Sequence, residues 1–136
     1  MKLTNEKIAA MCRDLDNGVL DNVGIVGYTA ARNYRALHSV AEPFLTQRNK
    51  LIMEYGEVQY DDDGNINDYV VDPKSEKFTE FAAKYQELAD IECEVEILTL
   101  PEEKAIDAIS GAQLLQLDWM FERDQGQSIG VRLLDY

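Results

Sequence analysis

The sequence predicts a helix-rich α+β fold in a single acidic domain, residues 1–124, with a C-terminal tail at residues 125–136. Three observations support this. Several segments carry apolar residues at helical spacing, two short β-prone segments flank an Asp-rich turn, and one segment alternates strictly between apolar and acidic residues. With 136 residues, 46% of them hydrophobic, the chain can bury one core. We therefore expect a long kinked helix and two or three further helices packed on a small antiparallel sheet with a hairpin.

The first predicted helix is short and apolar on one side. Thr4 is a suitable N-cap, and Asn17-Gly18 supplies a stop. Between them, apolar residues recur at three- and four-residue spacing, namely Ile8, Met11, Cys12 and Leu15.

A Gly-, Asp- and Asn-rich loop over residues 18–27 is expected to lead to the longest helix, which Gly56 ends. Its apolar stripe consists of Tyr34, Leu37, Ala41, Phe44, Leu45, Ile52 and Tyr55. Pro43 lies inside this pattern and lacks a backbone N–H, so we expect a kink or a break near residues 39–43. A basic ridge of Arg32, Arg35 and Lys50 is predicted opposite the stripe.

Residues 57–60 and 66–71 are β-prone and enclose an Asp-, Gly- and Asn-rich turn, which predicts a hairpin. Asp72-Pro73 then has the character of a helix start. The helix that follows has an apolar face of Phe78, Phe81, Ala82, Tyr85 and Leu88.

The alternation over residues 91–97 predicts a strand with one buried face, formed by Ile91, Cys93, Val95 and Ile97, and one solvated face of glutamates. Pro101 closes this strand, and residues 102–109 have room for a helical turn. Ser110 can cap a last helix that carries Leu114, Leu117, Trp119, Met120 and Phe121.

Charge excludes several classes of partner. The net charge is −13, which repels nucleic-acid phosphates and anionic lipids, so direct nucleic-acid or membrane binding is not expected. The charge is also uneven: residues 1–53 hold seven Lys or Arg and five acids, whereas residues 54–136 hold six and 21. The simplest interpretation is that the basic ridge pairs with the acidic half, and such exposed pairs contribute little stability.

Acidic residues form the first candidate binding site. The Asp61-Asp62-Asp63 turn and the row Glu92, Glu94 and Glu96 are expected to form an acidic, partner-binding face. The three glutamates project from one face of a strand about 6.8 Å apart, so water, cations or a basic partner must lie beside them. The turn does not fit an EF-hand, because Ile66 stands where its glycine would be required.

Apolar residues near the C-terminus form the second candidate site. Three consecutive large apolar residues cannot all face one way on a helix, so at least one must point elsewhere, which makes the last helix the leading candidate for a subunit or partner contact. The expected contact residues are Leu114, Trp119, Met120, Phe121, Ile129 and Leu133. The tail is expected to add a strand to a sheet or to contact a partner.

No catalytic or metal-binding constellation is apparent. His38 is the single histidine, and its place at the margin of the long apolar stripe suits packing better than general-base catalysis with Cys12 or a serine. Two distant cysteines fit neither a zinc site nor a disulfide framework, and no phosphate-binding glycine motif occurs. We expect no cofactor and no enzymatic activity.

The order of motifs resembles a family of small uncharacterised proteins encoded by tailed phages and prophages of Gram-positive bacteria. The resemblance covers most of residues 1–122 and excludes the tail. It rests on Lys50-Leu51-Ile52-x-x-Tyr55-Gly56-Glu57, the Asp63-Gly64-Asn65 turn, Phe78, Glu87-Leu88 and Glu94-Val95-Glu96-Ile97. It implies a viral origin and a small helix-hairpin-helix-strand domain, and it transfers no catalytic residue.

Two functional hypotheses follow. The first is a non-enzymatic phage-type protein that binds viral or host proteins, or its own copies, as a particle component or assembly factor. The second is an acidic anti-defence or host-takeover inhibitor that occupies a nucleic-acid-binding site on a host enzyme. Both place the protein in the bacterial cytoplasm, and the first also places it in the virion.

Overall fold

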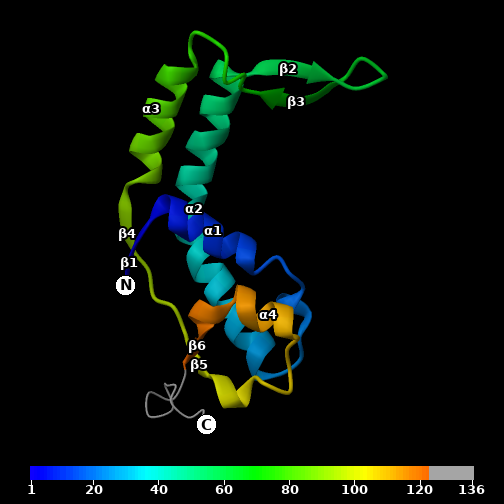
Figure 1. The fold of residues 1–136 in the computed structure, drawn as a ribbon, viewed down its shortest axis with the longest axis vertical. Coiled ribbons are helices and arrows are strands. Elements are labelled where there is room, and N and C mark those ends of the chain that lie inside the picture. Colours follow the sequence, from blue (N-terminus) through cyan, green and yellow to red (C-terminus); the bar gives the residue numbers. More distant parts are fainter. Residues whose placement is uncertain (123–136) are drawn as a thin grey trace.

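One long helix, α2 (Ile25–Tyr55), runs along the long axis of the molecule (Figure 1). The computed structural model describes residues 1–122. Helix α1 (Asn5–Asp14) crosses α2 near its middle, and α3 (Phe78–Ala89) lies beside its C-terminal half. The segment over residues 95–122 packs against its N-terminal half. The predicted helix-rich α+β class is confirmed.

Helix α1 begins and ends as the sequence predicts. The Thr4 hydroxyl oxygen accepts a hydrogen bond of 3.2 Å from the Lys7 backbone N–H, which caps the first turn. After the helix ends at Asp14, the chain turns at Gly18, whose φ of 93° favours glycine. The predicted apolar residues are all buried, namely Ile8, Met11, Cys12 and Leu15.

Helix α2 begins earlier than predicted. The expected loop over residues 18–27 contains a short 3₁₀ turn, η1 (Val19–Asp21), and α2 already includes Gly27. Glycine is required inside the helix there, because a Cβ at Gly27 would collide with the Asn22 carbonyl oxygen. A residue that signals a loop in the sequence therefore serves a close approach between the helix and the chain before it.

Of the kink or break predicted near residues 39–43, the break is absent, and Figure 1 shows instead that the axis of the continuous helix bends near its middle. Pro43 lies on the exposed side of α2, and the helix continues through it for about three turns, to Tyr55. Pro43 removes one backbone N–H donor, but Ala41 and Phe44 are buried on either side of it. Tertiary packing therefore holds the helix together where its local hydrogen bonding is weakest.

The hairpin is confirmed. Strand β2 (Glu57–Tyr60) pairs antiparallel with β3 (Ile66–Val70). Figure 1 shows that this hairpin points away from the helices at the end of α2.

The strands form three separate pairs, which corrects the prediction of one antiparallel sheet. In addition to the hairpin, β1 (Lys2–Thr4) pairs antiparallel with β4 (Glu92–Glu94). The third pair, β5 (Leu100–Pro101) and β6 (Phe121–Glu122), is parallel. The predicted strand over residues 91–97 contracts to β4 because its partner β1 is only three residues long.

Helix α3 begins later than predicted. Instead of starting the helix, Asp72 closes a turn of its own, with its side chain and carbonyl accepting hydrogen bonds of 2.9 Å from the backbone N–H groups of Lys74 and Ser75. The helix starts at Phe78. Its predicted apolar face is half-buried throughout, comprising Phe78, Phe81, Ala82, Tyr85 and Leu88.

The last helix is confirmed at its start and shorter than expected at its end. Helix α4 (Gly111–Gln116) has Ser110 as its N-cap, with the reciprocal hydrogen bonds of a capping box to Gln113. Two 3₁₀ turns flank it: η2 (Glu102–Lys104) and η3 (Asp118–Met120).

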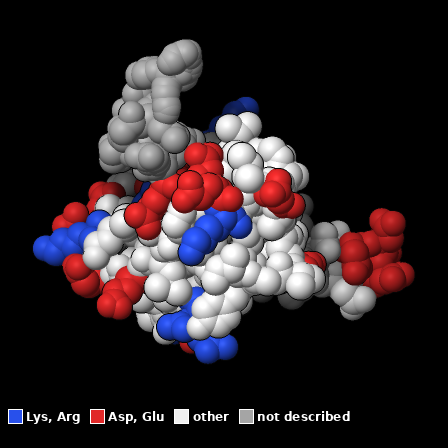
Figure 2. Space-filling view, turned by 90° about the horizontal axis from the view of Figure 1, so that it is seen from below, with Lys and Arg blue, Asp and Glu red and all other residues white. Residues whose placement is uncertain are grey.

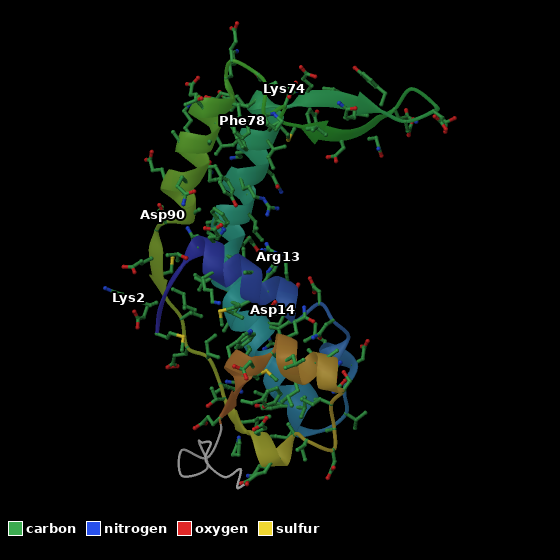
Figure 3. All side chains as sticks on the ribbon, viewed as in Figure 1. Lys2, Arg13, Asp14, Lys74, Phe78 and Asp90 are labelled. Atoms are coloured by element: carbon green, nitrogen blue, oxygen red, sulfur yellow. The ribbon has the colours of Figure 1, made fainter. Side chains whose placement is uncertain are left out.

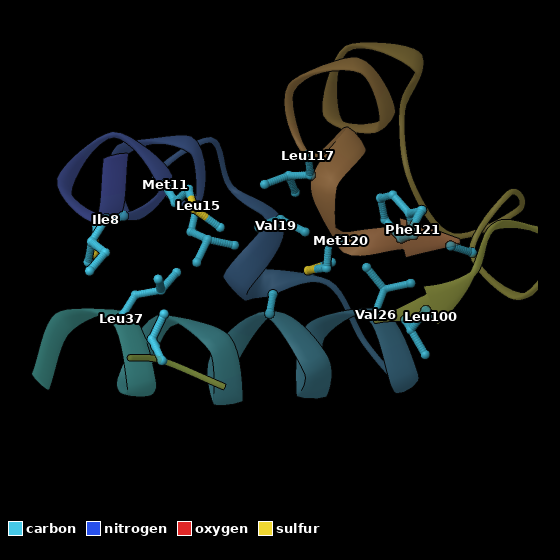
Figure 4. Close-up of a cluster of buried hydrophobic side chains, with 14 of the residues drawn as sticks. Ile8, Met11, Leu15, Val19, Val26, Leu37, Leu100, Leu117, Met120 and Phe121 are labelled. Atoms are coloured by element: carbon cyan, nitrogen blue, oxygen red, sulfur yellow. The ribbon is translucent and has the colours of Figure 1, made fainter. Parts of the chain in front are cut away.

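The main core lies between α1, the N-terminal half of α2 and the C-terminal segment (Figure 4). Its largest fully buried side chains include Ile8, Met11, Leu15, Leu37, Leu117 and Met120. A second, smaller cluster contains Ala9, Phe44 and Ala89. We call residues 1–43 and 91–122 the base, and residues 44–90 the arm.

Two buried asparagines hold the end of α3 and the irregular chain after it against the other helices. Asn33 is 1% exposed, and its Oδ1 accepts a 2.7 Å bond from the Leu98 N–H while its Nδ2 donates a 2.9 Å bond to the Leu98 carbonyl. Asn5 Nδ2 donates to the Leu88 carbonyl at 2.9 Å. Asn33 thus pairs backbone groups that a longer strand would have paired, and Asn5 pairs a carbonyl in the last turn of α3.

Candidate functional site

The apolar segment predicted to contact a partner is mostly part of the core. Met120 and Phe121 are 0% and 8% exposed, and Leu114 and Trp119 are half-buried against the same core. The prediction assumed a helix through residues 119–121, whereas the chain changes there from a 3₁₀ turn to a strand. This change turns Met120 and Phe121 inward, so the prediction that they form an exposed contact surface is wrong.

The other apolar candidates lie elsewhere. Ile129, Leu133 and the tail at residues 125–136 lie outside the described residues, so their contact role stays a prediction. Helix α4 does leave one large apolar side chain in solvent, Leu115.

The Asp-rich turn is exposed at the far end of the hairpin. Asp61 Oδ1 accepts two hydrogen bonds of 2.9 Å, from the backbone N–H groups of Asp63 and Asn65, and Gly64 has a φ of 82°. Asp61 is therefore used to form the turn, whereas Asp62 is directed to solvent. Residues 57–71 hold five acids and no Lys or Arg. Figure 2 shows the acidic side chains gathered where the hairpin projects.

The hairpin also exposes apolar side chains that the sequence analysis did not single out. Tyr60 is 65% and Ile66 is 58% exposed, and Val70 is exposed as well. A two-stranded hairpin is marginally stable in water by itself, and no further strand pairs with this one in the described part of the chain. Alternation within the two strands was visible in the sequence, but no local signal shows that a strand face stays uncovered.

The three glutamates of the predicted acidic row are exposed, as expected. Glu94 Oε1 accepts a 3.0 Å hydrogen bond from the Met1 ammonium group. The row lies beside the lower end of α3, far from the tip of the hairpin (Figure 1). The structure therefore does not bring Asp61, Asp62 and Asp63 together with Glu92, Glu94 and Glu96, and the predicted single acidic face is two separate surfaces.

The candidate nucleophile and base are used in packing. The His38 ring is half-buried and stacks on Tyr34, with ring centroids 5.5 Å apart. Cys12 is buried; its burial, together with the Asp16 carboxylate, raises the pKa of the thiol, while Arg13 lowers it. Within residues 1–122, no three His, Cys, Asp or Glu side chains are grouped so that they could hold a metal ion.

A groove follows one face of α2 in the base. It has a volume of about 560 Å³ and is lined by Leu20 and by α2 residues from successive turns, namely Ala31, Tyr34, Arg35, His38, Ser39 and Glu42. The sequence signal for it was the basic ridge, because Arg32 and Arg35 lie on or beside this face. Periodicity could not reveal the hollow itself, which depends on where η1 places Leu20.

Within residues 1–122, no ion pair joins the basic ridge to the acidic half, contrary to the simplest interpretation of the sequence. Arg32 lies over the Tyr28 ring at 5.7 Å and donates a 2.7 Å hydrogen bond to its hydroxyl. The ion pairs formed by residues 1–122 join the Met1 ammonium to Glu94 and Lys84 to Glu80. Arg32 and Arg35 thus keep their charge at the surface beside the groove.

No helix within residues 1–122 is both long enough and apolar enough to cross a bilayer. We compared the chain with family models, curated proteins and solved structures, and none of them matches it.

Proposed function

We propose that this protein is non-enzymatic and acts by binding other proteins, with the β2–β3 hairpin as its main contact element. The observation that carries this proposal is the hairpin itself. It stands clear of the helices, exposes Tyr60, Ile66 and Val70, and holds five acids without a basic residue. A partner that covers these apolar side chains would stabilise a hairpin that has little stability alone.

The chemistry of the hairpin defines the partner's surface. Five carboxylates require a basic surface, while Tyr60 and Ile66 require apolar area between the basic groups. Charge of this kind mainly accelerates and selects encounters, and the apolar contacts supply most of the affinity. The phage setting, with a role in the particle or its assembly in the host cytoplasm, rests on the sequence resemblance.

The test is affinity capture from phage-infected Gram-positive cells with three forms of the full chain. The hairpin variant is Asp62→Lys/Asp63→Lys, which leaves the turn-forming Asp61 intact. The control is Glu92→Lys/Glu96→Lys, which changes the net charge equally on exposed positions of the base. We expect wild type and control to capture the same proteins and the hairpin variant to lose them by about tenfold or more. Equal capture by all three forms would contradict the proposal.

The alternative function is an inhibitor that occupies a nucleic-acid-binding site on a host enzyme. The observation that favours it is the uninterrupted acidity of the hairpin, which matches a groove built for phosphates. In that case duplex DNA or RNA should displace the captured protein, and binding should weaken steeply with salt. Capture that nucleic acid leaves unchanged would remove this alternative and retain the first.

A further inference from the structure

We propose that the partner of the hairpin adds a strand to the outer edge of β2, and that basic and apolar side chains alternate along this added strand. The inference rests on the proposed function, because it takes the hairpin as the contact element and names how the partner binds to it. Three features of the hairpin carry it: the open edge of β2, the different chemistry of the two faces, and acidic side chains that no basic residue of the hairpin balances.

The outer edge of β2 offers backbone groups that have no strand beside them. The Asp61 N–H donates a 2.9 Å hydrogen bond to the Asn65 carbonyl across the turn, so the backbone of Asp61 faces β3. Because backbone groups alternate in direction along a strand, the N–H and carbonyl groups of Val58 and Tyr60 point away from β3. Within residues 1–122, β3 is the only strand that pairs with β2. An added strand can therefore bond to these backbone groups.

The outer edge of β3 is less suited to pairing. The register shifts between Gln59 and Tyr60, where Asn67 is the extra residue of a β-bulge in β3. The N–H of Tyr69 on this edge donates a 2.8 Å hydrogen bond to Asp68 Oδ1, so it already has a partner. Bulges, prolines and lysines protect edge strands from pairing, and β2 contains no proline and no lysine. The open edge of the hairpin is therefore that of β2.

The two faces of the hairpin differ in chemistry, because residues directly opposite each other on paired strands share a face. One face carries apolar and aromatic side chains, namely Val58, Tyr60, Ile66 and Tyr69. The other face carries mainly polar and acidic side chains, namely Glu57, Gln59, Asp68 and Val70. A strand added beside β2 continues both faces, so its side chains should be apolar on the first face and polar on the second.

Basic side chains match the second face. Residues 57–71 hold five acids and no Lys or Arg, and within residues 1–122 none of these acids forms an ion pair. The nearest basic residues in the chain are Lys50 and Lys74, and Figure 3 shows Lys74 near the upper end of α2, away from the tip of the hairpin. The same charge opposes pairing with the β2 edge of a second copy, because the acids of two hairpins would then lie close together.

The first test titrates the full chain with synthetic peptides of about eight residues, an ordinary strand length, whose ends are blocked. The probe alternates lysine and valine, and the control alternates glutamate and valine. Calorimetry at low and high salt measures affinity, and NMR measures amide exchange at Val58 and Tyr60. We expect the lysine peptide to bind, more weakly at high salt, and to slow exchange at both residues. The glutamate peptide should bind at least about tenfold more weakly.

N-methylated forms of the probe distinguish strand addition from contact through side chains alone. In an added antiparallel strand the valine N–H groups would bond to β2, whereas in a parallel strand the lysine N–H groups would do so. One peptide is therefore methylated at every valine nitrogen and another at every lysine nitrogen of the backbone. We expect one of them to bind about tenfold more weakly than the other, because its methyl groups replace the bonding hydrogens.

A variant of the protein tests the same edge from the other side. Val58→Pro removes an N–H that points away from β3, and proline is tolerated at such edge positions. Val58→Ala is the matched control, because it shortens the side chain and keeps the N–H. We expect Val58→Pro to bind the lysine peptide about tenfold more weakly than Val58→Ala. Circular dichroism confirms folding, and if Val58→Pro disrupts the hairpin, the methylated peptides decide the question with the wild-type chain.

Four outcomes would overturn this inference. They are a lysine peptide that does not bind, methylated peptides that bind equally well, a folded Val58→Pro variant that binds as well as Val58→Ala, or self-association of the wild type that Val58→Pro abolishes in sedimentation velocity, which would assign the edge to a second copy. If the inference falls while Asp62→Lys/Asp63→Lys still loses captured proteins, the proposed function stands. If no captured protein depends on the hairpin, both fall.

Discussion

The base and the arm contain similar apolar residues but bury them very differently. The main core cluster has fifteen buried residues, and all of them belong to the base. Of residues 44–90, Phe44 and Ala89 are the buried hydrophobic residues. The base surrounds one stretch of α2 with α1, η1 and the C-terminal segment, whereas the arm lays α3 alone beside the next stretch.

A row of aromatic contacts joins α3 to α2 in the arm, in addition to the small cluster of Ala9, Phe44 and Ala89. Tyr85 contacts both Phe44 and Phe81, and Phe81 also contacts Tyr55 and Phe78, with ring centroids 6.0 to 6.2 Å apart. Figure 3 shows Phe78 at the upper end of α3, near the start of the hairpin. Of these aromatic side chains all except Phe44 are half-buried, so one side of the row packs against protein and the other side faces solvent. From this difference in burial between base and arm, we infer that the base supplies most of the free energy of unfolding. The arm, which buries less apolar surface, is the region that a bound partner would stabilise most.

Truncating one side chain in each region tests this directly. Leu37→Ala opens a cavity in the base, where the side chain is fully buried, and should lower the free energy of unfolding by about 2–5 kcal/mol. Phe81→Ala removes a larger side chain from the arm, but one that is half-buried, and should cost about 1–2 kcal/mol. Urea denaturation followed by circular dichroism measures both. A cost for Phe81→Ala that equals that of Leu37→Ala would contradict the comparison.

The hydrogen bonds between Asn33 and Leu98 give a second comparison between a buried position in the base and an exposed position in the arm. Asn33→Ala leaves the Leu98 N–H and carbonyl without their side-chain partner, which should cost about 2–4 kcal/mol. Asn49, exposed on the same helix within the arm, is the matched control, and Asn49→Ala should change stability by less than about 0.5 kcal/mol. Thermal or urea unfolding distinguishes the two. Equal effects would mean that Asn33 does not hold this segment in place.

Pro43 stands at the boundary between the two regions. Pro43→Ala restores a backbone N–H and relieves the clash with the preceding turn, so it should stabilise the protein by about 1–3 kcal/mol. Amide hydrogen exchange should then slow most in residues 39–47. An unchanged or lower stability would show that α2 needs a weak point where base and arm meet.

The smallest expected effect concerns a helix cap. Ser110→Ala removes the capping box of α4 in the base and should cost about 1 kcal/mol. The control is Thr46→Ala on the exposed side of α2 in the arm, where alanine should be neutral or slightly stabilising because of its helix propensity. Chemical denaturation of the two variants in parallel is the measurement. If Thr46→Ala lowered the free energy of unfolding as much as Ser110→Ala, the capping box would contribute no specific stability.

Local patterns predicted local structure well. The N-caps Thr4 and Ser110, the Asp61 turn and the apolar stripe of α2 act through hydrogen bonds and spacings that span only a few residues. These features can therefore be predicted from short stretches of sequence. The candidate site was predicted only in part: the hairpin turn was recognised, but neither the exposed strand faces nor the α2 groove was.

The errors that concern the candidate sites involve neighbours that are distant in the chain. Residues 119–121 look like a helix with surplus apolar side chains, and they become core because β6 pairs with β5 and faces the start of α2. The strand predicted over residues 91–97 stops at Glu94 because β1 offers no more partners. The acidic turn and the acidic row looked like one surface, but the turn lies at the far end of the arm and the row lies in the base, beyond the other end of α3.

By itself, the sequence determined the helices, the hairpin and the excess of negative charge, since periodicity, capping and composition act within a few residues or over the whole chain. The tertiary structure alone decided which apolar faces are covered, where the charges gather and which surface remains for a partner. The physical reason is that burial is a property of two surfaces that meet, and the second surface lies far away in the chain.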